Sequence, residues 1–572
     1  MSDLLNSASL VMIPSGYKED VVYSQIPTDG SGDLSFTRAS NGTRVNSAGL
    51  VEVAPWNAIQ YSEDFANAVW GIPNGGSSVV VTSNATTAPN GTSTADKIEI
   101  ANGTNDRIEQ VSTAPILTSG LPCTFSCYIK SVSGTGKVGI RSGQSGVSSV
   151  LSYTNEWQRL TWTFNAAATN EIPQFCNSTL VFGADSAPSF YIWGAQLNIG
   201  STAKPYFPTT DRLNVPRLTY QNGGGGCPSL LLEKQSTNLV TYSEQFDNAA
   251  WNKIQISATA NNTTSPDGTQ NADLITTTAT GVCYTYELIT GTSGAYSASI
   301  YAKNGNNNYL ALNIQNSINN WVTSVFDLSD GSLGEYAQGS SGGIVYVNHT
   351  ITPVGNGWYR CVLNYTTNQN SYYCPMFAPL KTGNSYTSAY GEAQSNANNK
   401  TIYLWGAQLE ASSYATSLIN TTSSSATRVA DYTSRSGLAL TNFTFAVNFK
   451  PLDYVVELFD FEKTGGGRMF YVAVQSNGFI TFNGVSGGTI GAIGSVLPKN
   501  QTCKLAFSLN ASTSNLKVYI NGSIIGTYTT NITTFGAFFG LQSFGYNPGM
   551  QIEQIAIFPS VLTDAECQSL TT

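Results

Sequence analysis

The chain has 572 residues and a formal net charge of −9, and only 11% of its residues are charged. This length exceeds what one hydrophobic core usually organises, and a hydrophobic content of 41% excludes a disordered polymer. The acidic balance, without any run of Lys and Arg, excludes the electrostatic footprint of a nucleic-acid-binding protein. We therefore expect several folded domains and no nucleic-acid partner.

The inventory of ligating side chains argues against a metal or a cofactor. His349 is the single histidine, so His-rich metal sites are excluded and one imidazole remains to activate a nucleophile. The nine cysteines lack CxxC spacing, which indicates neither a zinc site nor a disulfide framework and favours a reducing folding compartment. The N-terminus lacks a signal-peptide pattern, and no stretch reaches the roughly 18 apolar residues of a membrane span. We expect no metal, no cofactor, no secretion signal and no membrane insertion.

The first 48 residues differ from the rest of the chain. Residues 1–48 are richer in Pro and Gly and lack the repeated pattern that begins at residue 49. We treat residues 1–48 as a separate N-terminal segment.

Two copies of one module come next, at residues 49–212 and 236–428, with a linker or strand segment at residues 213–235 between them. The block LVEVAPWNAIQYSEDFANAVW from Leu50 aligns without a gap with LLEKQSTNLVTYSEQFDNAAW from Leu231. Later blocks keep their order up to YIWGAQL and YLWGAQL, while the offset changes from 181 to 212 residues. Loop insertions produce such a drift between two copies of one domain.

Within each copy the apolar residues alternate with polar ones in short runs such as RLTWTF and RCVLNY, bounded by Gly, Asn, Pro and Ser. This period of two predicts antiparallel strands with one wet face. Strands spaced this way over about 160 residues favour a two-sheet sandwich or jelly roll. The fold class is therefore all-β, with tandem antiparallel β-sandwich or jelly-roll modules.

The repeated tryptophans are interpreted as packing residues. Trp70 and Trp251 close the repeated YSE block and are predicted to anchor the first strand of each copy. In the WGAQL strand, strict alternation places Trp193 and Ala195 on one face and Ile192 on the other. A sugar-stacking platform is the alternative for Trp193 and its counterpart Trp405, but a repeated position in a repeated fold favours the core.

Residues 429–572 carry a third pattern. Asn521-Gly522 lies at the turn of a predicted hairpin, and Thr563 with Glu566 predicts a capped short helix near the C-terminus. The order of strand, hairpin, last strand and short helix resembles the concanavalin A-like, laminin-G-type sandwich over about a quarter of the chain.

A wider resemblance covers most of the chain. The strings LSFTRASNGTRVNSAGLVE, NVPRLTYQNGGGGCPSLLLEKQSTNLVTYSE, VFDLSDGSLG, VGNGWYRC and LWGAQLE are similar to a family of phage tail-fibre, head-fibre and head-spike proteins. In that family the TRVNxxGLIE and VPRLDY strings lie close together, whereas here the first module separates Glu52 from Pro216. The first module can therefore be an insertion, with residues 30–52 and 213–235 packing together at its base.

This resemblance implies a structural component of a virion that is folded and assembled in the host cytoplasm. Residues 1–48 would attach to other virion proteins, the chain would form a homotrimer, and carbohydrate-binding-module-like sandwiches would adhere to host-surface glycans. The sequence shows no coiled coil that would support the trimer independently.

One acidic strand is a candidate for glycosidic chemistry. Asp460 and Glu462 in VVELFDFEK share a strand face with Cα atoms about 6.6 Å apart, a separation at which paired carboxylates can act. Related sandwiches carry three acids on one face, but position 458 is Leu458 here. We interpret the pair as an ordinary acidic wet face that can contact a ligand, and we predict no catalytic residue.

Two loops are further candidates. Tyr546 and Asn547 in SFGYNPGM are the aromatic and amide side chains expected to contact a ligand at a sandwich end. The turn from Asp327 to Gly331 could bind calcium, but such turns more often satisfy their own backbone amides. We predict no metal site there and a hydrogen-bonded or solvated role for His349.

Three functions remain open. A virion fibre or spike protein that binds glycans explains the low charge, the free thiols and the tandem modules. A polysaccharide depolymerase would need a cleft with paired carboxylates, and an inert decoration protein would need no ligand at all. The first is favoured, and the protein is not expected to be an enzyme.

Overall fold

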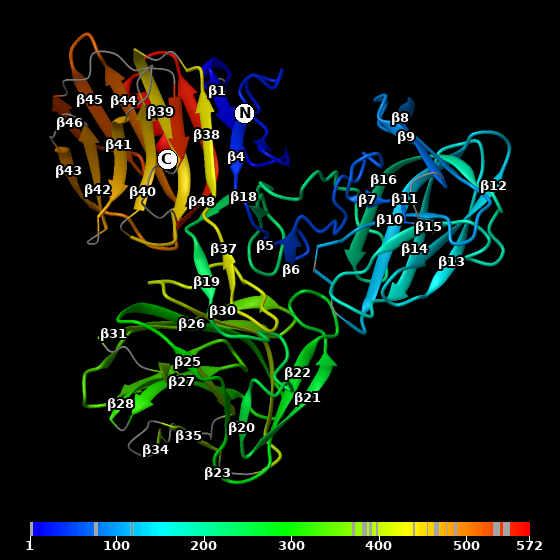
Figure 1. Cartoon of the computed structure of the whole chain (residues 1–572). Coiled ribbons are helices and arrows are strands. Elements are labelled where there is room, and N and C mark those ends of the chain that lie inside the picture. Colours follow the sequence, from blue (N-terminus) through cyan, green and yellow to red (C-terminus); the bar gives the residue numbers. More distant parts are fainter. Residues whose placement is uncertain are drawn as a thin grey trace. The chain divides into compact units, whose positions relative to one another are not determined.

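In the computed structural model, strands take up 51% of the chain and helix 2% (Figure 1). The structure describes residues 4–572 except 74–77, 115, 118, 318, 369–371, 374, 380–385, 388–391, 396–397, 439–440, 455, 463–467, 476–477, 485–488, 530–537 and 542–548. The chain divides into two compact units, Met1–Glu52 with Asn214–Thr572 and the intervening Val53–Leu213.

The unit Val53–Leu213 is the first module, a sandwich of two antiparallel five-stranded sheets. One sheet has the order β13 (Ser148–Tyr153), β12 (Gly136–Ser142), β15 (Pro173–Cys176), β10 (Arg107–Gln110) and β7 (Trp70–Gly71). The other has the order β14 (Gln158–Asn165), β11 (Pro122–Ser131), β16 (Ser189–Ile199), β9 (Ala95–Ile100) and β8 (Val79–Thr86). One cluster of buried side chains from both sheets fills the space between them.

The second module has the same architecture with six strands in each main sheet. One sheet has the order β20 (Asn252–Ile254), β24 (Tyr284–Tyr286), β33 (Met376–Pro379), β27 (Tyr309–Ser317), β28 (Asn320–Asp327) and β29 (Leu333–Gln338). The other has the order β21 (Ile256–Thr263), β22 (Ala272–Thr277), β36 (Thr401–Glu410), β26 (Gly294–Asn304), β31 (Trp358–Thr367) and β30 (Ile344–Gly355). Short strands complete it: β23 (Gly281–Val282) with β35 (Glu392–Ser395) and β34 (Tyr386–Thr387), and β25 (Ile289–Thr290) with β32 (Tyr372–Tyr373).

The strand orders of the two modules match one for one, apart from β29 and β30. These two consecutive strands add one edge strand to each main sheet of the second module. They lie between the blocks SCYIK/SIYAK and WQRLTWTF/WYRCVLNY, where the offset between the copies increases. The insertion detected in the sequence is therefore a pair of strands that widens both sheets.

The C-terminal sandwich has an eight-stranded and a nine-stranded sheet. The first has the order β17 (Leu218–Thr219), β18 (Ser229–Glu233), β48 (Gly549–Phe558), β39 (Asn442–Pro451), β44 (Cys503–Asn510), β45 (Asn515–Ile520) and β46 (Ser523–Thr529), with β1 (Leu10–Met12) also on β48. The second has the order β2 (Tyr17–Lys18), β3 (Val21–Val22), β4 (Leu34–Thr37), β38 (Tyr432–Ser436), β47 (Phe538–Leu541), β40 (Val456–Glu462), β41 (Arg468–Val474), β42 (Phe479–Gly484) and β43 (Thr489–Val496). Two strand pairs, β5 (Gly42–Val45) with β6 (Val51–Ala54) and β19 (Ser236–Asn238) with β37 (Ala426–Arg428), lie outside these sheets.

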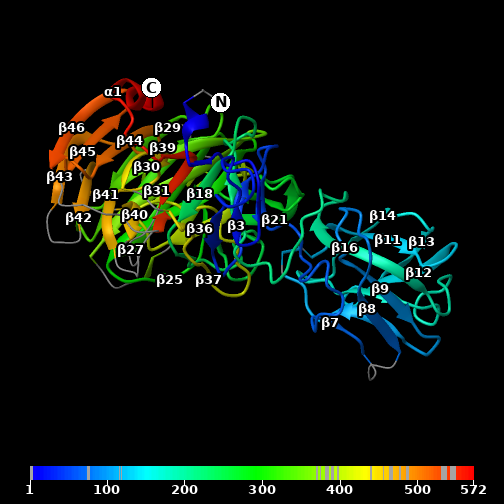
Figure 2. The same cartoon turned by 90° about the horizontal axis from the view of Figure 1, so that it is seen from above.

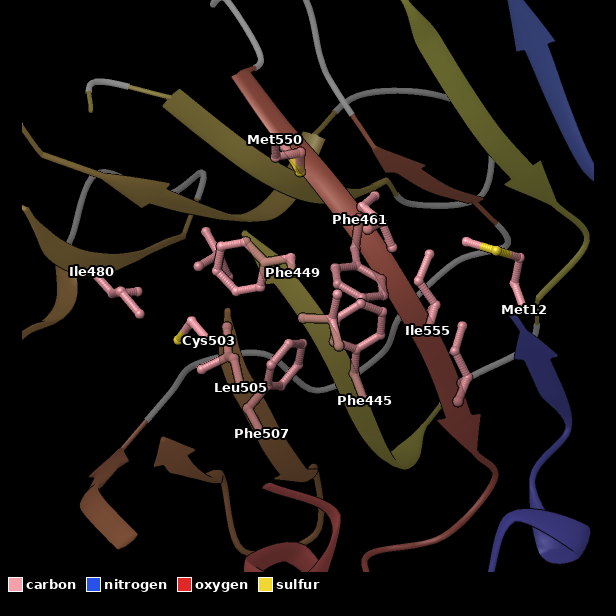
Figure 3. Close-up of a cluster of buried hydrophobic side chains, with 14 of the residues drawn as sticks. Met12, Phe445, Phe449, Phe461, Ile480, Cys503, Leu505, Phe507, Met550 and Ile555 are labelled. Atoms are coloured by element: carbon pink, nitrogen blue, oxygen red, sulfur yellow. The ribbon is translucent and has the colours of Figure 1, made fainter. Parts of the chain in front are cut away.

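The core of the C-terminal sandwich combines aliphatic side chains with several phenylalanines (Figure 3). Phe445 and Phe507 lie 5.3 Å apart between ring centroids, and Phe461 meets Phe445 edge-on at 5.9 Å. The predicted hairpin is present, because Asn521 and Gly522 have φ of 46° and 81° between β45 and β46. The predicted capping box at Thr563 begins α1 (Asp564–Thr571), which lies near the N-terminal residues of the chain (Figure 2).

Residues 1–48 contribute strands to the C-terminal sandwich. β1 pairs with β48, with Val11 opposite Ala556, and β4 pairs with β38, with Phe36 opposite Thr433. Met12 and Phe36 are buried in the same core as the C-terminal strands. The segment that the sequence marks as separate is thus an integral part of this domain, while its role in virion attachment stays a prediction.

The segments 30–52 and 213–235 meet at a buried ion cluster, as the displaced family strings suggest. The Asp431 carboxylate accepts hydrogen bonds from the guanidinium groups of Arg38, at 2.8 Å, and of Arg217. The Glu233 carboxylate accepts a hydrogen bond from Arg217 at 2.8 Å. Arg428 lies 3.5 Å from the Glu233 carboxylate. Burial alone would raise the pKa of Glu233, but the charges of Arg428 and Arg217 outweigh it and lower that pKa to about 2. These ionised groups tie three distant parts of the chain together.

The repeated YSE block builds the same corner in both modules. The indole Nε1 of Trp70 donates to the Tyr61 carbonyl at 3.1 Å, and Trp251 donates to the Tyr242 carbonyl at 3.1 Å. Both tyrosines have φ of 47°, and both tryptophans are buried. The interpretation of Trp70 and Trp251 as structural anchors is confirmed.

A buried aspartate in each module accepts hydrogen bonds from the backbone of this corner. Asp96 accepts the backbone N–H groups of Phe65 and Asn84, each at 2.8 Å. Asp273 accepts the equivalent N–H groups of Phe246 at 2.7 Å and Asn261 at 2.9 Å. Because the N–H groups of the buried residues Phe65 and Phe246 must be paired, the repeated aspartates serve the fold.

The WGAQL strand departs from strict alternation. Trp193 is buried, as predicted, but Ala195 joins Ile192 in the main core instead of sharing the face of Trp193. Gly194 has φ of 66° and an extra residue stands in β16 opposite β11, so a β-bulge resets the alternation. Gly406, with φ of 64°, lies at the equivalent β-bulge of β36 in the second module.

Candidate functional site

The side chains of the four residues predicted to contact a ligand are outside the part of the molecule that the structure describes. Tyr546 and Asn547 lie outside the described residues. Asp460 and Glu462 lie on β40, whose backbone pairs regularly with β47, but their side chains are outside the described part of the molecule. Phe461 between them is buried in the core. All four therefore stay predictions.

The turn after β28 satisfies its own backbone. Asp327 accepts from the Ser329 N–H at 2.8 Å and from its hydroxyl at 2.5 Å, and Asp330 accepts from the Ser332 N–H at 2.9 Å. Within the described residues, no group of three or more His, Cys, Asp or Glu side chains is arranged to hold a metal ion. The geometry is that of a self-bonded turn.

His349 is a buried strand residue with both ring nitrogens engaged. Its Nδ1 lies 2.8 Å from the Tyr346 hydroxyl, and its Nε2 lies 3.2 Å from the Gly334 carbonyl. Burial lowers its pKa below the ordinary value, which favours the neutral ring. The predicted hydrogen-bonded role is confirmed.

One cavity of the larger unit has a volume of about 470 Å³, and polar side chains form part of its wall. This volume falls in the range of small-molecule sites. We call it the polar cavity. It is lined by Thr43, Arg44, Val45, Val51, Thr219, Tyr220, Asn222, Leu231, Glu233, Tyr301, Asn348, Thr350, Thr352, Arg360, Val362, Asn364, Tyr414, Ala415, Ser417, Leu418, Lys450, Leu452, Lys499, Asn500 and Gln551.

One wall is the outer face of β30 and β31. Cross-strand pairs place Asn348 opposite Asn364, and Thr352 opposite Arg360. The Asn364 amide nitrogen donates to the Asn348 side-chain oxygen at 2.6 Å. This wall presents amide, hydroxyl and guanidinium groups, and half of it depends on β30, which the first module lacks.

The opposite wall is the outer face of the C-terminal sandwich. Leu231 on β18, Gln551 on β48 and Lys450 on β39 form one row of cross-strand neighbours. All three line the cavity. The cavity therefore exists only because the second module and the C-terminal sandwich fold as one unit.

Most charges at the cavity are already paired. Arg44 bonds to Glu52 at 2.9 Å, and Lys499 bonds to Asp453 at 3.0 Å. Glu233 belongs to the buried ion cluster.

Arg360 has no acidic partner among the described residues. Its Nη2 donates to the Ser299 hydroxyl at 3.2 Å and to the Thr416 carbonyl at 2.6 Å. Its guanidinium carbon lies 5.4 Å from the centre of the Tyr301 ring. Lys450, which is half-buried, forms no ion pair within the part of the chain that the structure describes.

Sequence reasoning missed the polar cavity. The alternation in IVYVNHTIT does indicate one polar strand face, with Asn348 and Thr350 on it. The wet face of an edge strand is unremarkable alone, and Lys450 is about 100 residues further on. Only the long-range packing of two domains identifies these residues as one site.

Comparison with known proteins identifies the C-terminal domain. Residues 420–568 match the concanavalin A-like lectin/glucanases superfamily. No curated protein matches the chain. The protein is thus an all-β chain with two sandwich modules and a concanavalin A-like lectin/glucanase-type domain.

Several solved structures resemble parts of the chain. The CBM40 of Ruminococcus gnavus IT-sialidase bound to α2,3-sialyllactose is 18% identical in sequence, with a TM-score of 0.21. The match covers 23% of this chain and 83% of that chain. The CBM22-1–CBM22-2 tandem domain of Paenibacillus barcinonensis Xyn10C has 10% identity, coverage of 62% and 98%, and a TM-score of 0.20. The SAP-like pentraxin of Limulus polyphemus has 14% identity, coverage of 25% and 75%, and a TM-score of 0.22. At these TM-scores none of the three bears on function.

No helix in the described part of the chain is long and apolar enough to cross a membrane.

Proposed function

We propose that this protein is a carbohydrate-binding structural component of a phage particle, a head or tail fibre or spike that adheres to host-surface glycans. The observation that carries glycan binding is the match of residues 420–568 to the concanavalin A-like lectin/glucanases superfamily. The phage assignment rests on the family strings in the sequence, from TRVNSAGLVE to LWGAQLE.

The polar cavity supports the proposal because its chemistry suits a sugar. Sugar hydroxyls need partners that both donate and accept, and the amides of Asn348 and Asn364 with the hydroxyls of Thr350 and Thr352 provide them. The volume of about 470 Å³ suits a short saccharide rather than a protein segment.

The proposal assigns no catalysis. The protein would act in the virion as a homotrimer, attached to other virion proteins through residues 1–48. Since β1 and β4 of this segment pair within the C-terminal sandwich, the contacts would be made by its exposed turn at residues 28–31.

A glycan array probed with the full-length protein tests binding, and mass spectrometry of the eluted glycans tests cleavage. We expect binding without a change in mass. Binding to no glycan would contradict the adhesin function and favour an inert decoration protein. Shortened products would instead make the protein a depolymerase and direct mutagenesis to Asp460 and Glu462. Immunogold labelling of purified particles checks the virion location, and unlabelled particles would contradict it.

A further inference from the structure

We propose that the polar cavity selects a saccharide that bears a carboxylate, with Lys450 and Arg360 as the groups that recognise its charge. This inference rests on the proposed glycan-binding function and names the ligand class of that site. The ligand would be a uronic or sialic acid unit within a short saccharide.

The cavity lining carries a net positive charge, whereas the whole protein carries a net negative charge. The chain has 35 acidic and 26 basic residues, yet the cavity is lined by four cations and one carboxylate. Glu233, the one carboxylate, is neutralised by Arg217 at 2.8 Å. The unpaired charge in the cavity is therefore positive.

Lys450 and Arg360 supply this charge from opposite walls. Arg44 and Lys499 are balanced by Glu52 and Asp453. Lys450 and Arg360 have no acidic partner among the described residues. A cation in a partly enclosed polar space attracts an anion more strongly than an exposed one, because less water screens the interaction.

The first module provides an internal control for Arg360. Its counterpart Arg159 bonds in the same way, with Nη2 donating to the Ser126 hydroxyl at 3.1 Å and to the Lys204 carbonyl at 2.7 Å. These contacts are therefore a property of the fold, which holds the guanidinium rigidly. The buried Nε atom has no hydrogen-bond partner in either arginine. What is new in the second module is the surroundings, β30 and Lys450.

The remaining wall explains why the anion would belong to a sugar. Asn364 Oδ1 is buried without a hydrogen-bond partner, although its amide nitrogen donates to Asn348. Thr350 and Thr352 add hydroxyls on the same strand face. Two cations are too few for a polyphosphate backbone. A fatty acid would leave the amides and hydroxyls of β30 and β31 without hydrogen-bond partners. An acidic saccharide uses both the charge and the neutral hydrogen-bonding groups.

Isothermal titration calorimetry of the full-length protein tests this inference. The probes are trigalacturonic acid, 3′-sialyllactose and the neutral analogues galactotriose and lactose. We expect at least one acidic probe to bind about tenfold more tightly than its neutral analogue, and Lys450→Gln to reduce its affinity about tenfold, the loss of one charge-assisted hydrogen bond. The matched control is Lys504→Gln, a half-buried lysine on β44 of the same sheet that does not line the cavity, and it should leave affinity unchanged.

The outcomes separate this inference from the proposed function. Equal affinity for an acidic probe and its neutral analogue, or equal loss in Lys450→Gln and Lys504→Gln, would overturn the acidic specificity while glycan binding stands. Binding of neither acidic probe would overturn the inference, whereas the glycan array decides the function independently. Asn348→Ala tests the uncharged hydrogen-bonding groups of β30, and it should weaken binding of the acidic probe about threefold to tenfold.

Discussion

The first and second modules share a fold, and their main sheets differ in one pair of strands. Both have the same strand order, the same tryptophan-to-carbonyl bond and the same buried aspartate behind the corner. Only the second has β29 and β30, and only β30 contributes Asn348, Thr350 and Thr352 to a cavity.

This comparison separates folding residues from candidate binding residues without an alignment of homologues. A residue present in both copies with the same contacts, such as Trp70 and Trp251, serves the common fold. Arg360 shares its Nη2 contacts with Arg159 but, unlike Arg159, lines the polar cavity. A residue found only in the second copy is free to serve a ligand. Substitutions at both kinds of residue test that division.

The largest effect should result from loss of the corner tryptophans. Trp70→Ala and Trp251→Ala each remove a buried indole and its hydrogen bond, so each should destabilise its own module by about 3–5 kcal/mol. Differential scanning calorimetry of the full chain should show one transition shifted in each variant. Trp251→Phe is the milder control. If one alanine variant melts like the wild type, the two corners are not equivalent.

The next effect concerns the ion cluster, which has no equivalent among the described residues of the first module. Asp431→Asn leaves Arg38 and Arg217 buried without their shared carboxylate, and we expect a loss of about 3 kcal/mol in unfolding free energy. Chemical denaturation of the full chain measures it. An unchanged midpoint would show that the cluster does not hold the larger unit together.

The second module should also respond to pH. Burial, with the negative charges of Asp267 and Asp273, raises the pKa of Glu244 to about 8, and burial raises that of Asp273 to about 6. A carboxyl whose folded pKa exceeds its unfolded value favours folding most when protonated, so stability should fall as pH rises from about 4.5 to 8.

Thermal unfolding at pH 5 and pH 8 checks this expectation. The transition of the second module should occur at a lower temperature at pH 8, and Glu244→Gln should reduce the difference. The matched variant Glu63→Gln in the first module should have a smaller effect, because burial raises the pKa of Glu63 while hydrogen bonds with Tyr206 and Trp193 oppose the rise. The opposite trend with pH would refute the assignment of Glu244.

Local patterns allowed much of the fold to be predicted, because period-two alternation and the Asn521-Gly522 turn depend on nearby residues. The bulge at Gly194 was missed, since a single glycine inside an apolar run does not show that an extra residue is present. The strands of residues 1–48 were missed because two- to four-residue strands between Pro and Gly carry little periodicity.

The candidate site could not be predicted for a different reason. Lys450 and Asn348 belong to different domains, and neither stands in a motif. Their proximity results from the packing of the second module on the C-terminal sandwich. The repeat comparison did contain a usable signal, because the offset between copies increases where β29 and β30 are inserted.

The most direct test of the division between folding and binding residues is glycan binding by the variant Asn348→Ala/Thr350→Ala/Thr352→Ala. Its control is Thr161→Ala/Thr163→Ala on β14 of the first module, where exposed threonines also alternate along an outer strand. We predict that the triple variant stays folded and loses glycan binding, while the control stays folded and keeps glycan binding. Undiminished binding by a folded triple variant would contradict the assignment of the site to β30.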